Sequence, residues 1–271
     1  MRNINYSSYS ILFFLLVLAA CSNSARVEFD ESSLNSVPES ISYTKNYDGH
    51  LQGMASDFEN HIFWSHTQQL VKTDLNGKIL KVIDVQNHHG DLEYYKGKVY
   101  VAVNFGKFNE EPGLADSWIY VYDAKDLSFY SKYPVPEVVH GAGGIAIHND
   151  QAMVIGGLPE NGNYKVNFIY EYDLNFNLKK RHTLESGYTY KGIQTACYFN
   201  NHWYFACYGS TRVGVVPKVL KVKQTPGNEL QMVQSIDTDM SYGMIGLKDE
   251  EFIYSNRTLD AKAVVGKLKN K

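Results

Sequence analysis

Short apolar runs recur along the chain after residue 40, separated by turn-forming residues. Clear examples are "HIFWS" (61–65), "KVYVA" (98–102), "QAMVIG" (151–156), "HWYFA" (202–206) and "EFIYS" (251–255). Short apolar runs bounded by turns predict β-strands. After residue 25, no window of ten or more residues has the apolar period of an amphipathic helix. The pattern therefore predicts an all-β chain.

The predicted strands recur in five units of about 50 residues each. The units align on the first apolar residue of the second strand, which is Ile62, Val99, Ala152, Trp203 and Phe252. The residues nine positions before these anchors are Gly53, Gly90, Gly143, Gln194 and Gly243. Four glycines at five equivalent positions indicate a repeat whose first strand runs in a crowded place.

Four strands in each unit are typical of the blades of a β-propeller. The fifth unit has only three predicted strands, whereas "SISYTKN" (40–46) is a spare strand before the first unit. The spare strand can complete the last blade and close the ring, which removes an open sheet edge. We therefore predict an all-β, five-bladed propeller with four-stranded blades over residues 40–271. An open solenoid or a double sandwich would leave the spare strand without a partner.

Composition agrees with this fold and limits the partners. The 271 residues include 21 Tyr and 13 Phe, and aromatic enrichment favours strands. The net charge is −3 and no stretch is rich in Lys or Arg, so we expect no nucleic-acid partner. We also expect a monomer.

The N-terminus has the features of a secretory signal. Arg2 precedes the apolar run "ILFFLLVLA" (11–19), so residues 1–20 are predicted to be a signal peptide. The following "LAAC", which ends at Cys21, resembles the bacterial lipobox; that resemblance implies cleavage before Cys21 and a lipid on its thiol. Residues 21–39 are then a lipidated cysteine and a flexible tether. By the same resemblance, Ser22 implies an envelope lipoprotein of the outer membrane.

The two other cysteines, Cys197 and Cys207, flank a predicted hairpin turn at Asn200–Asn201. That register places Cys197 opposite Tyr204 and not opposite Cys207. We expect two buried free thiols.

Histidines and tyrosines recur where the inner strands begin, at one mouth of the predicted propeller. The expected mouth residues are His50, Gln52, His89, Asp91, His140, Tyr190, Gln194 and Tyr242. Three interpretations remain open. The histidines can tie neighbouring blades together, or bind a polar ligand directly. They can also hold Zn, Mn or Fe through His50, His89 and His140, with Tyr190, Tyr242 or Asp91 as catalytic groups.

Long connections are expected to border the same mouth, at 104–117, 158–165, 209–217 and 256–261. They carry Arg212 and Arg257, whose charge suits an acidic or hydroxylated ligand. The signatures "HxQG", "HxGD" and "HGAGG" are similar to those of uncharacterised secreted propeller proteins. We predict an exported, lipid-anchored propeller that binds a small polar, carbohydrate-related ligand. The alternatives are a metal-dependent lyase or hydrolase and an envelope interaction scaffold.

Overall fold

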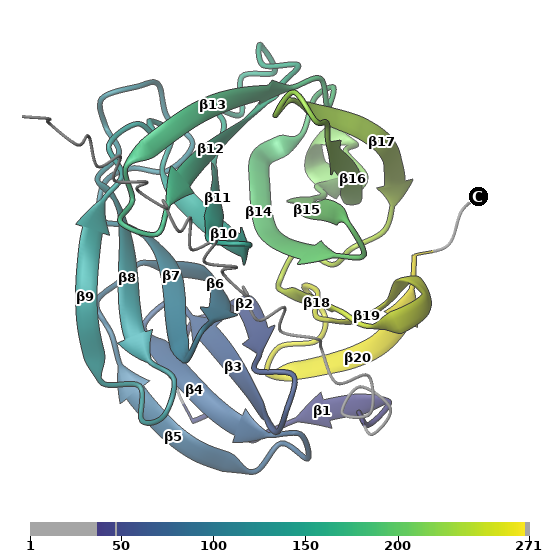
Figure 1. The fold of residues 1–271 in the computed structure, drawn as a ribbon. Coiled ribbons are helices and arrows are strands. Elements are labelled where there is room, and N and C mark those ends of the chain that lie inside the picture. The colour runs from purple at the N-terminus through teal and green to yellow at the C-terminus, as the bar shows by residue number, and fades with distance from the viewer. Residues whose placement is uncertain (1–36, 47, 269–271) are drawn as a thin grey trace, which may run out of the picture. The chain divides into compact units, whose positions relative to one another are not determined.

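Five four-stranded antiparallel sheets follow one another around a central axis, as the repeat predicts (Figure 1). The computed structural model describes residues 37–46 and 48–268. The predicted signal peptide, Cys21 and the tether as far as residue 36 lie outside the described residues. The described residues belong to one compact unit, Glu31–Lys271. No helix in the described ranges is long and apolar enough to cross a membrane.

Each blade runs from an inner strand at the axis to an outer strand at the circumference. Blade one contains β2 (Leu51–Ser56), β3 (His61–His66), β4 (Gln69–Asp74) and β5 (Ile79–Asp84). Blade two contains β6 (His89–Tyr95), β7 (Lys98–Asn104), β8 (Ser117–Asp123) and β9 (Phe129–Pro134). Blade three contains β10 (Ala142–His148), β11 (Gln151–Gly156), β12 (Asn167–Asp173) and β13 (Leu178–Leu184). Blade four contains β14 (Tyr190–Phe199), β15 (His202–Tyr208), β16 (Lys218–Gln224) and β17 (Leu230–Asp237).

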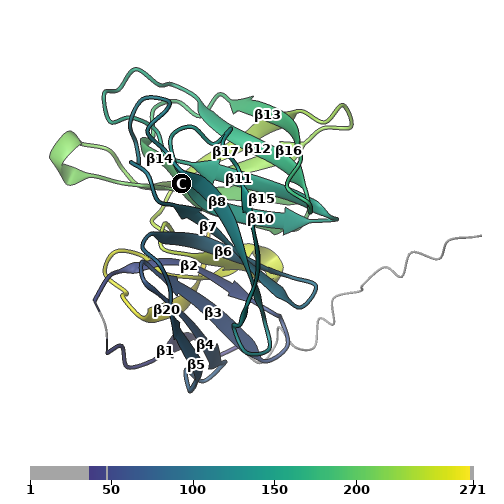
Figure 2. The ribbon, with the colours of Figure 1, turned by 90° about the vertical axis from the view of Figure 1, so that its left-hand side faces the viewer.

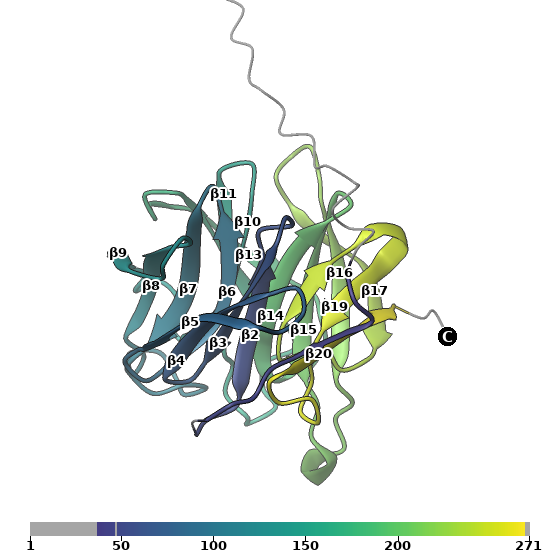
Figure 3. The same ribbon diagram turned by 90° about the horizontal axis from the view of Figure 1, so that it is seen from below.

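Blade five closes the ring with a strand from the other end of the chain. It contains β18 (Met244–Gly246), β19 (Glu251–Tyr254), β20 (Lys262–Lys267) and β1 (Ser40–Ser42). In the antiparallel pair of β1 and β20, Ile41 lies opposite Ala263. This closure confirms the predicted role of the spare strand, and Figure 3 shows β1 beside β20.

The apolar side chains form five core clusters, and each cluster lies between two neighbouring blades. The inner and middle strands are covered on both sides, which explains why all six residues of β2 are buried. The outer strands have one partner and face solvent, so β5 is mostly exposed. Burial therefore decreases from the axis to the circumference, and the five interfaces hold the ring together.

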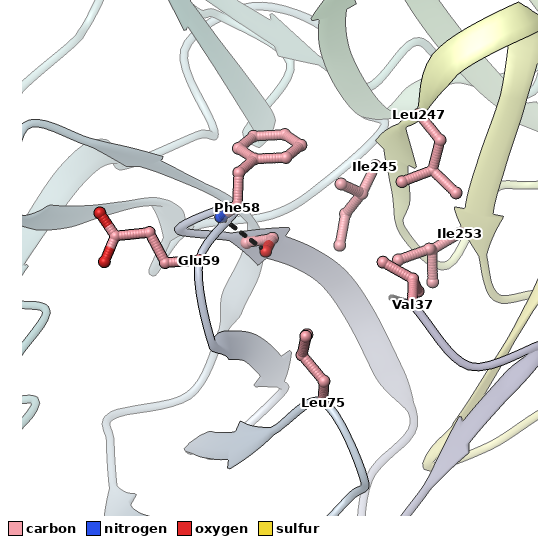
Figure 4. Close-up of a pocket in the computed structure, with 8 residues that line it drawn as sticks. Val37, Phe58, Glu59, Leu75, Ile245, Leu247 and Ile253 are labelled. Atoms are coloured by element: carbon pink, nitrogen blue, oxygen red, sulfur yellow. Dashed lines mark hydrogen bonds between the residues drawn. The ribbon is translucent and has the colours of Figure 1, made fainter. Parts of the chain in front are cut away.

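Apolar side chains of blades five and one meet at the seam between these blades (Figure 4). A small cavity of about 10 Å³ remains there, lined by Val37, Ser56, Phe58, Glu59, Leu75, Ile245, Leu247 and Ile253. The backbone N–H of Phe58 donates to Ser56 Oγ at 2.9 Å and fixes the turn below β2. Val37, which precedes β1, also lines this cavity. Residues before β1 therefore add apolar contacts to the hydrogen bonds by which β1 closes the ring.

The repeated glycines lie where inner strands approach one another at the axis. A Cβ atom on Gly53 would lie 1.9 Å from Oδ1 of Asp91, and one on Gly90 would lie 2.5 Å from the carbonyl oxygen of Gly143. At Gly243 the nearest atom would be the backbone nitrogen of Met54, at 2.7 Å. A side chain does not fit at these three positions, and Gly243 also has a φ of 125°, whereas a Cβ atom on Gly143 would make only ordinary contacts.

One buried carboxylate, that of Asp91, occupies the space that Gly53 leaves. Asp91 is 1% exposed, and its Oδ2 accepts a hydrogen bond from the backbone N–H of Ala196 at 2.9 Å. The backbone N–H groups of Met54 and Leu92 also donate to it. Asp91 therefore connects the inner strands β2, β6 and β14. Burial raises the pKa of Asp91 well above its usual value, and these hydrogen bonds oppose the rise.

Glu93 follows Asp91 on β6 and is a second acid enclosed by the blades. It accepts hydrogen bonds from its neighbour Tyr94 N (3.0 Å) and from the backbone N–H of Ile147 in blade three. Burial raises the pKa of Glu93 to about 8.

The two cysteines follow the predicted register. Cys197 lies opposite Tyr204, and both Cys197 and Cys207 are buried free thiols. Burial raises the pKa of both thiols, so neither is disposed to react at neutral pH.

The role of β1 can be tested with one buried side chain. Ile41 is 1% exposed in the cluster between blades five and one. Ile41→Ala is expected to lower the free energy of unfolding by about 2–5 kcal/mol, because it removes buried methyl groups and leaves a cavity. The measurement is denaturant unfolding, with the exposed Ser40→Ala as control. Equal stability of the two variants would show that closure by β1 contributes little.

The raised pKa of Glu93 predicts that the free energy of unfolding depends on pH. Its pKa is about 8 in the folded state against 4.5 normally, so the folded state keeps a proton that the unfolded chain releases. The stabilisation is complete below pH 4.5 and is lost as the pH rises through 8. Glu93→Gln should therefore match the wild type at pH 5 and exceed its stability at pH 9 by about 2–4 kcal/mol. Urea unfolding at both pH values, with exposed Glu59→Gln as control, measures the difference; a pH-independent difference would contradict it.

Candidate functional site

Three rim connections meet over the mouth where the inner strands begin. The connection between β7 and β8 contacts blade three, because Asn109 N donates to the carbonyl of His140 at 3.1 Å. It also contacts the connection between β11 and β12, where Asn161 Nδ2 donates to Glu111 at 3.2 Å. The connection between β15 and β16 carries the short helix η1 (Thr211–Val213) and projects from the ring (Figure 2). Its Arg212 reaches Glu160 at 2.9 Å. Three of the four predicted rim loops therefore gather at one place.

The mouth itself contains a group that we name the imidazole–glutamine cluster: His50, Gln52 and His88. The side-chain amide of Gln52 lies 2.8 Å from Nε2 of His50 and 3.3 Å from Nε2 of His88. It also lies 3.4 Å from the hydroxyl of Thr67. Gln52 is 7% exposed, whereas His50 lies at the surface. A buried amide thus holds two imidazoles from adjacent blades.

Aromatic rings surround this cluster. The ring of Tyr242 lies 5.3 Å from that of His50, and Tyr208 lies 5.5 Å from Tyr242. On the other side, Phe108 packs edge-on to His88 at 4.9 Å. Burial lowers the pKa of His88 to about 4, so its imidazole is neutral at pH 7. Burial raises the pKa of Tyr242, and the positive charge of Arg257 on the rim opposes that rise.

His89, a predicted metal ligand, has a structural role instead. It is fully buried, its Nδ1 donates to the carbonyl of Gln86 at 2.6 Å, and its Nε2 accepts from the hydroxyl of Tyr122 at 2.8 Å. Both ring nitrogens are therefore used, one by the connection that leads into β6 and the other by Tyr122 of blade two. Burial lowers the pKa of His89 to about 4.

His140 is likewise held away from the other two predicted ligands. It is 4% exposed, its Nδ1 donates to the carbonyl of Glu110 at 2.8 Å, and its ring packs against Tyr164 and Phe168. Across residues 37–46 and 48–268, no group of three His, Cys, Asp or Glu residues is arranged to hold a metal ion. The structure thus does not bring His50, His89 and His140 together as a metal site.

The other predicted residues divide between the axis and blade four. Asp91, a catalytic candidate, is buried and bonded to three strands, so it has no access to a ligand at the mouth. Tyr190 accepts a hydrogen bond from Arg212 at 3.3 Å, and Gln194 donates to the carbonyl of Lys191 at 2.9 Å. These blade-four residues belong to the rim contacts around Glu160 rather than to the imidazole–glutamine cluster.

An open cleft of about 340 Å³ lies between the rim connections. We name it the loop cleft; it is lined by Phe108, Asn109, Glu110, Glu111, Pro159, Glu160, Asn161 and Lys191. Three carboxylates and one ammonium group make its lining acidic. Lys191 and Arg212 both pair with Glu160, at 3.1 and 2.9 Å, so the predicted positive charge of Arg212 is paired at this cleft, whereas Arg257 acts on Tyr242 at the mouth.

Sequence reasoning missed His88, Phe108 and the acidic lining of the loop cleft. The doublet His88–His89 was the only available signal. The pairing of β6 with β7 shifts register between His89 and Leu92, so simple alternation does not tell which histidine faces the mouth. Phe108 and the glutamates lie in long connections, where no periodic pattern operates.

No protein-family model matches the sequence, and no curated protein matches it. Solved structures do match. A protein of unknown function from Bacteroides caccae is 13% identical, with a TM-score of 0.52 over 79% of this chain and 73% of that one. The WD40 domain of Neurospora crassa Pan2 is 12% identical, with a TM-score of 0.44 over 82% of this chain and 64% of that one. The WD40 propeller domain of Doa1 is 10% identical, with a TM-score of 0.47 over 84% and 81%. At these identities the likeness concerns the fold alone.

Two adjacent histidines provide a test of the structural assignment. His89→Ala removes the partner of two buried groups, the hydroxyl of Tyr122 and the carbonyl of Gln86, and should lower stability by about 2–4 kcal/mol. His88→Ala, at the half-buried mouth position, should cost less than about 1 kcal/mol. Thermal and denaturant unfolding of both variants measure this. A larger loss for His88→Ala would reverse the two roles.

Proposed function

We propose that the protein is an exported, lipid-anchored β-propeller that binds a small, hydroxyl-rich ligand at the mouth, in the class of carbohydrates. One observation carries the proposal: a 93% buried amide, Gln52, lies within hydrogen-bond distance of two imidazoles from neighbouring blades. Buried polar groups at the open end of a rigid scaffold are typical of ligand sites. Tyr242 and Phe108 add aromatic surface on either side of them.

The chemistry of these groups suits hydroxyls. A neutral imidazole has one donor and one acceptor nitrogen, and an amide has both a donor and an acceptor. A hydroxyl group also donates and accepts, so it can join such a network without any net charge. Aromatic faces pack well against the apolar C–H surface of a sugar ring, while the tyrosine hydroxyls keep polar contacts.

A metal-dependent lyase or hydrolase is the second candidate, and the geometry favours it less. Binding a metal through His89 would break its hydrogen bonds to Gln86, in the connection between β5 and β6, and to Tyr122 of blade two. His140 would have to leave its contacts with Glu110 and Phe168. A role as an envelope interaction scaffold has no specific contact in its favour.

Export and lipid attachment complete the proposal and rest on the sequence before residue 37. The apolar run at 11–19 and the lipobox ending at Cys21 support a lipid-anchored domain in the bacterial envelope, with the outer membrane as its place. Fractionation of cells that express the full chain, with Cys21→Ser as the unlipidated control, tests this part separately. Equal membrane association of both forms would overturn it.

The proposed site predicts that a substitution at the mouth lowers the affinity for the ligand without lowering the stability of the protein. Gln52→Ala should weaken binding of a neutral oligosaccharide at least tenfold, because it removes the amide that holds both imidazoles. The measurement is calorimetric titration with the best oligosaccharide from a glycan array, together with the melting temperature. His202→Ala, at the first residue of β15, is the matched control and should bind like the wild type. A glycan array without any bound oligosaccharide, or unchanged affinity of Gln52→Ala, would contradict the proposal.

A further inference from the structure

Two Asn–Gly pairs occur in the sequence, Asn76–Gly77 and Asn161–Gly162, and they lie in very different surroundings. An asparagine followed by glycine can lose its side-chain amide without an enzyme, because glycine has no Cβ atom to keep its backbone nitrogen away from the side-chain carbonyl carbon. The reaction requires that this nitrogen is free and that the backbone of the pair can turn. The surroundings of each pair therefore decide whether it reacts.

The pair Asn76–Gly77 is held in the hairpin turn between β4 and β5. The backbone N–H of Gly77 donates to the carbonyl of Asp74 at 3.2 Å. Gly77 is buried against β1, since a Cβ atom on it would lie 1.9 Å from the carbonyl oxygen of Ser42. An attack by this nitrogen would break the hydrogen bond and displace the turn from β1. The fold therefore protects Asn76.

The pair Asn161–Gly162 lies in the connection between β11 and β12, and its glycine is open. No described residue accepts a hydrogen bond from the backbone N–H of Gly162. A Cβ atom on Gly162 would meet no other atom within 4 Å, and Asn161 is exposed. The nitrogen that must attack is thus available and has room to move.

Both ends of the Asn161 amide are held by neighbouring groups. Its Oδ1 accepts a hydrogen bond from the backbone N–H of Asn163 at 3.0 Å, and its Nδ2 donates to Oε1 of Glu111 at 3.2 Å. When a nucleophile adds to the carbonyl carbon, Oδ1 takes up negative charge, and a fixed N–H donor stabilises that charge. The contact with Asn163 therefore favours attack on this amide.

We propose that Asn161 is a site of spontaneous deamidation. The backbone nitrogen of Gly162 bonds to the side-chain carbonyl carbon of Asn161, the bond from that carbon to Nδ2 breaks, and ammonia leaves with the proton of the Gly162 N–H. Water then opens the cyclic imide at either carbonyl and gives an aspartyl or an isoaspartyl residue. Water is the only co-reactant, and nothing is oxidised or reduced.

The modification changes a contact between two rim connections. The amide of Asn161 is a donor that joins its own connection to Glu111, which lies in the connection between β7 and β8. An ionised carboxylate at this position has no donor and brings a second negative charge beside Glu111. The hydroxyl of Tyr164 still donates to Glu111 at 3.1 Å, so one contact between the connections is lost and another is kept. The inference does not depend on the function proposed for the mouth.

The test follows the folded full chain at mildly alkaline pH by peptide mass spectrometry, which separates amide, aspartyl and isoaspartyl forms. Conversion at Asn161 should be at least about tenfold faster than at Asn76, because attack at Asn76 must first break the hydrogen bond of Gly77. Asn161→Gln is the matched control. It keeps an amide beside Glu111, but its longer side chain forms a cyclic imide much more slowly, so position 161 should stay unmodified over the same period.

The same incubation in concentrated urea shows whether the fold causes the difference. Both pairs lose their surroundings in urea, so Asn76 and Asn161 should then react at similar rates. A preference for Asn161 that persists in urea would assign the selectivity to neighbouring residues in the sequence and overturn the structural argument. A rate at Asn161 in the folded protein that is no higher than the rate at Asn76 would also overturn it. Neither result bears on saccharide binding at the mouth, which the glycan array tests separately.

Discussion

The carboxylate of Asp91 joins three of the five inner strands at the place where the propeller is narrowest. Each blade otherwise packs only against its two neighbours, so the ring is held around its circumference by five separate apolar clusters. Asp91 accepts backbone hydrogen bonds from blades one, two and four, and thereby connects strands that are not neighbours in the ring. The desolvation of this acid is unfavourable, and the backbone hydrogen bonds oppose that cost. Gly53 follows from the same constraint, since a Cβ atom there would collide with the acid.

The mouth depends on this arrangement. His50, His88 and Tyr242 lie at or just before the starts of β2, β6 and β18, so their positions follow from how closely those strands approach the axis. Because the hydrogen bonds of Asp91 connect the inner strands, the residues at the starts of these strands are held in place. Such a pre-organised cluster would lose little conformational entropy on binding a ligand. The loop cleft is built differently. Its residues lie in connections that are held by contacts among themselves, such as those of Glu111 with Asn161 and Tyr164.

This difference explains which parts of the molecule can be predicted from the sequence. Every repeat has the same order of strands. The spacing of the repeats alone therefore predicts five blades and the closure of the last blade by β1. The sequence predicts the function of an individual polar residue less well than it predicts the fold. His88 and His89 are adjacent, and a shift of register in β6 decides which one faces the mouth. Asp91 has the sequence position of a site residue, but its burial follows from the glycines of two other blades, Gly53 and Gly144, which no local pattern connects to it. The acidity of the loop cleft depends on Glu160 pairing with Arg212 from the next blade, a contact between connections far apart in the chain.

Hydrogen-bonding capacity separates the structural polar groups from those proposed to bind. Both nitrogens of His89 are engaged by Gln86 and Tyr122, and Asp91 is surrounded by backbone donors, so neither has capacity left for a ligand. His88 differs: its Nδ1 is buried, and no other residue of the described chain bonds to it. A half-satisfied polar group is costly in a folded protein unless something else completes it. His89 and Asp91, which are fully bonded, therefore belong to the scaffold, and Gln52 and His88 at the mouth are the groups that we propose contact the ligand.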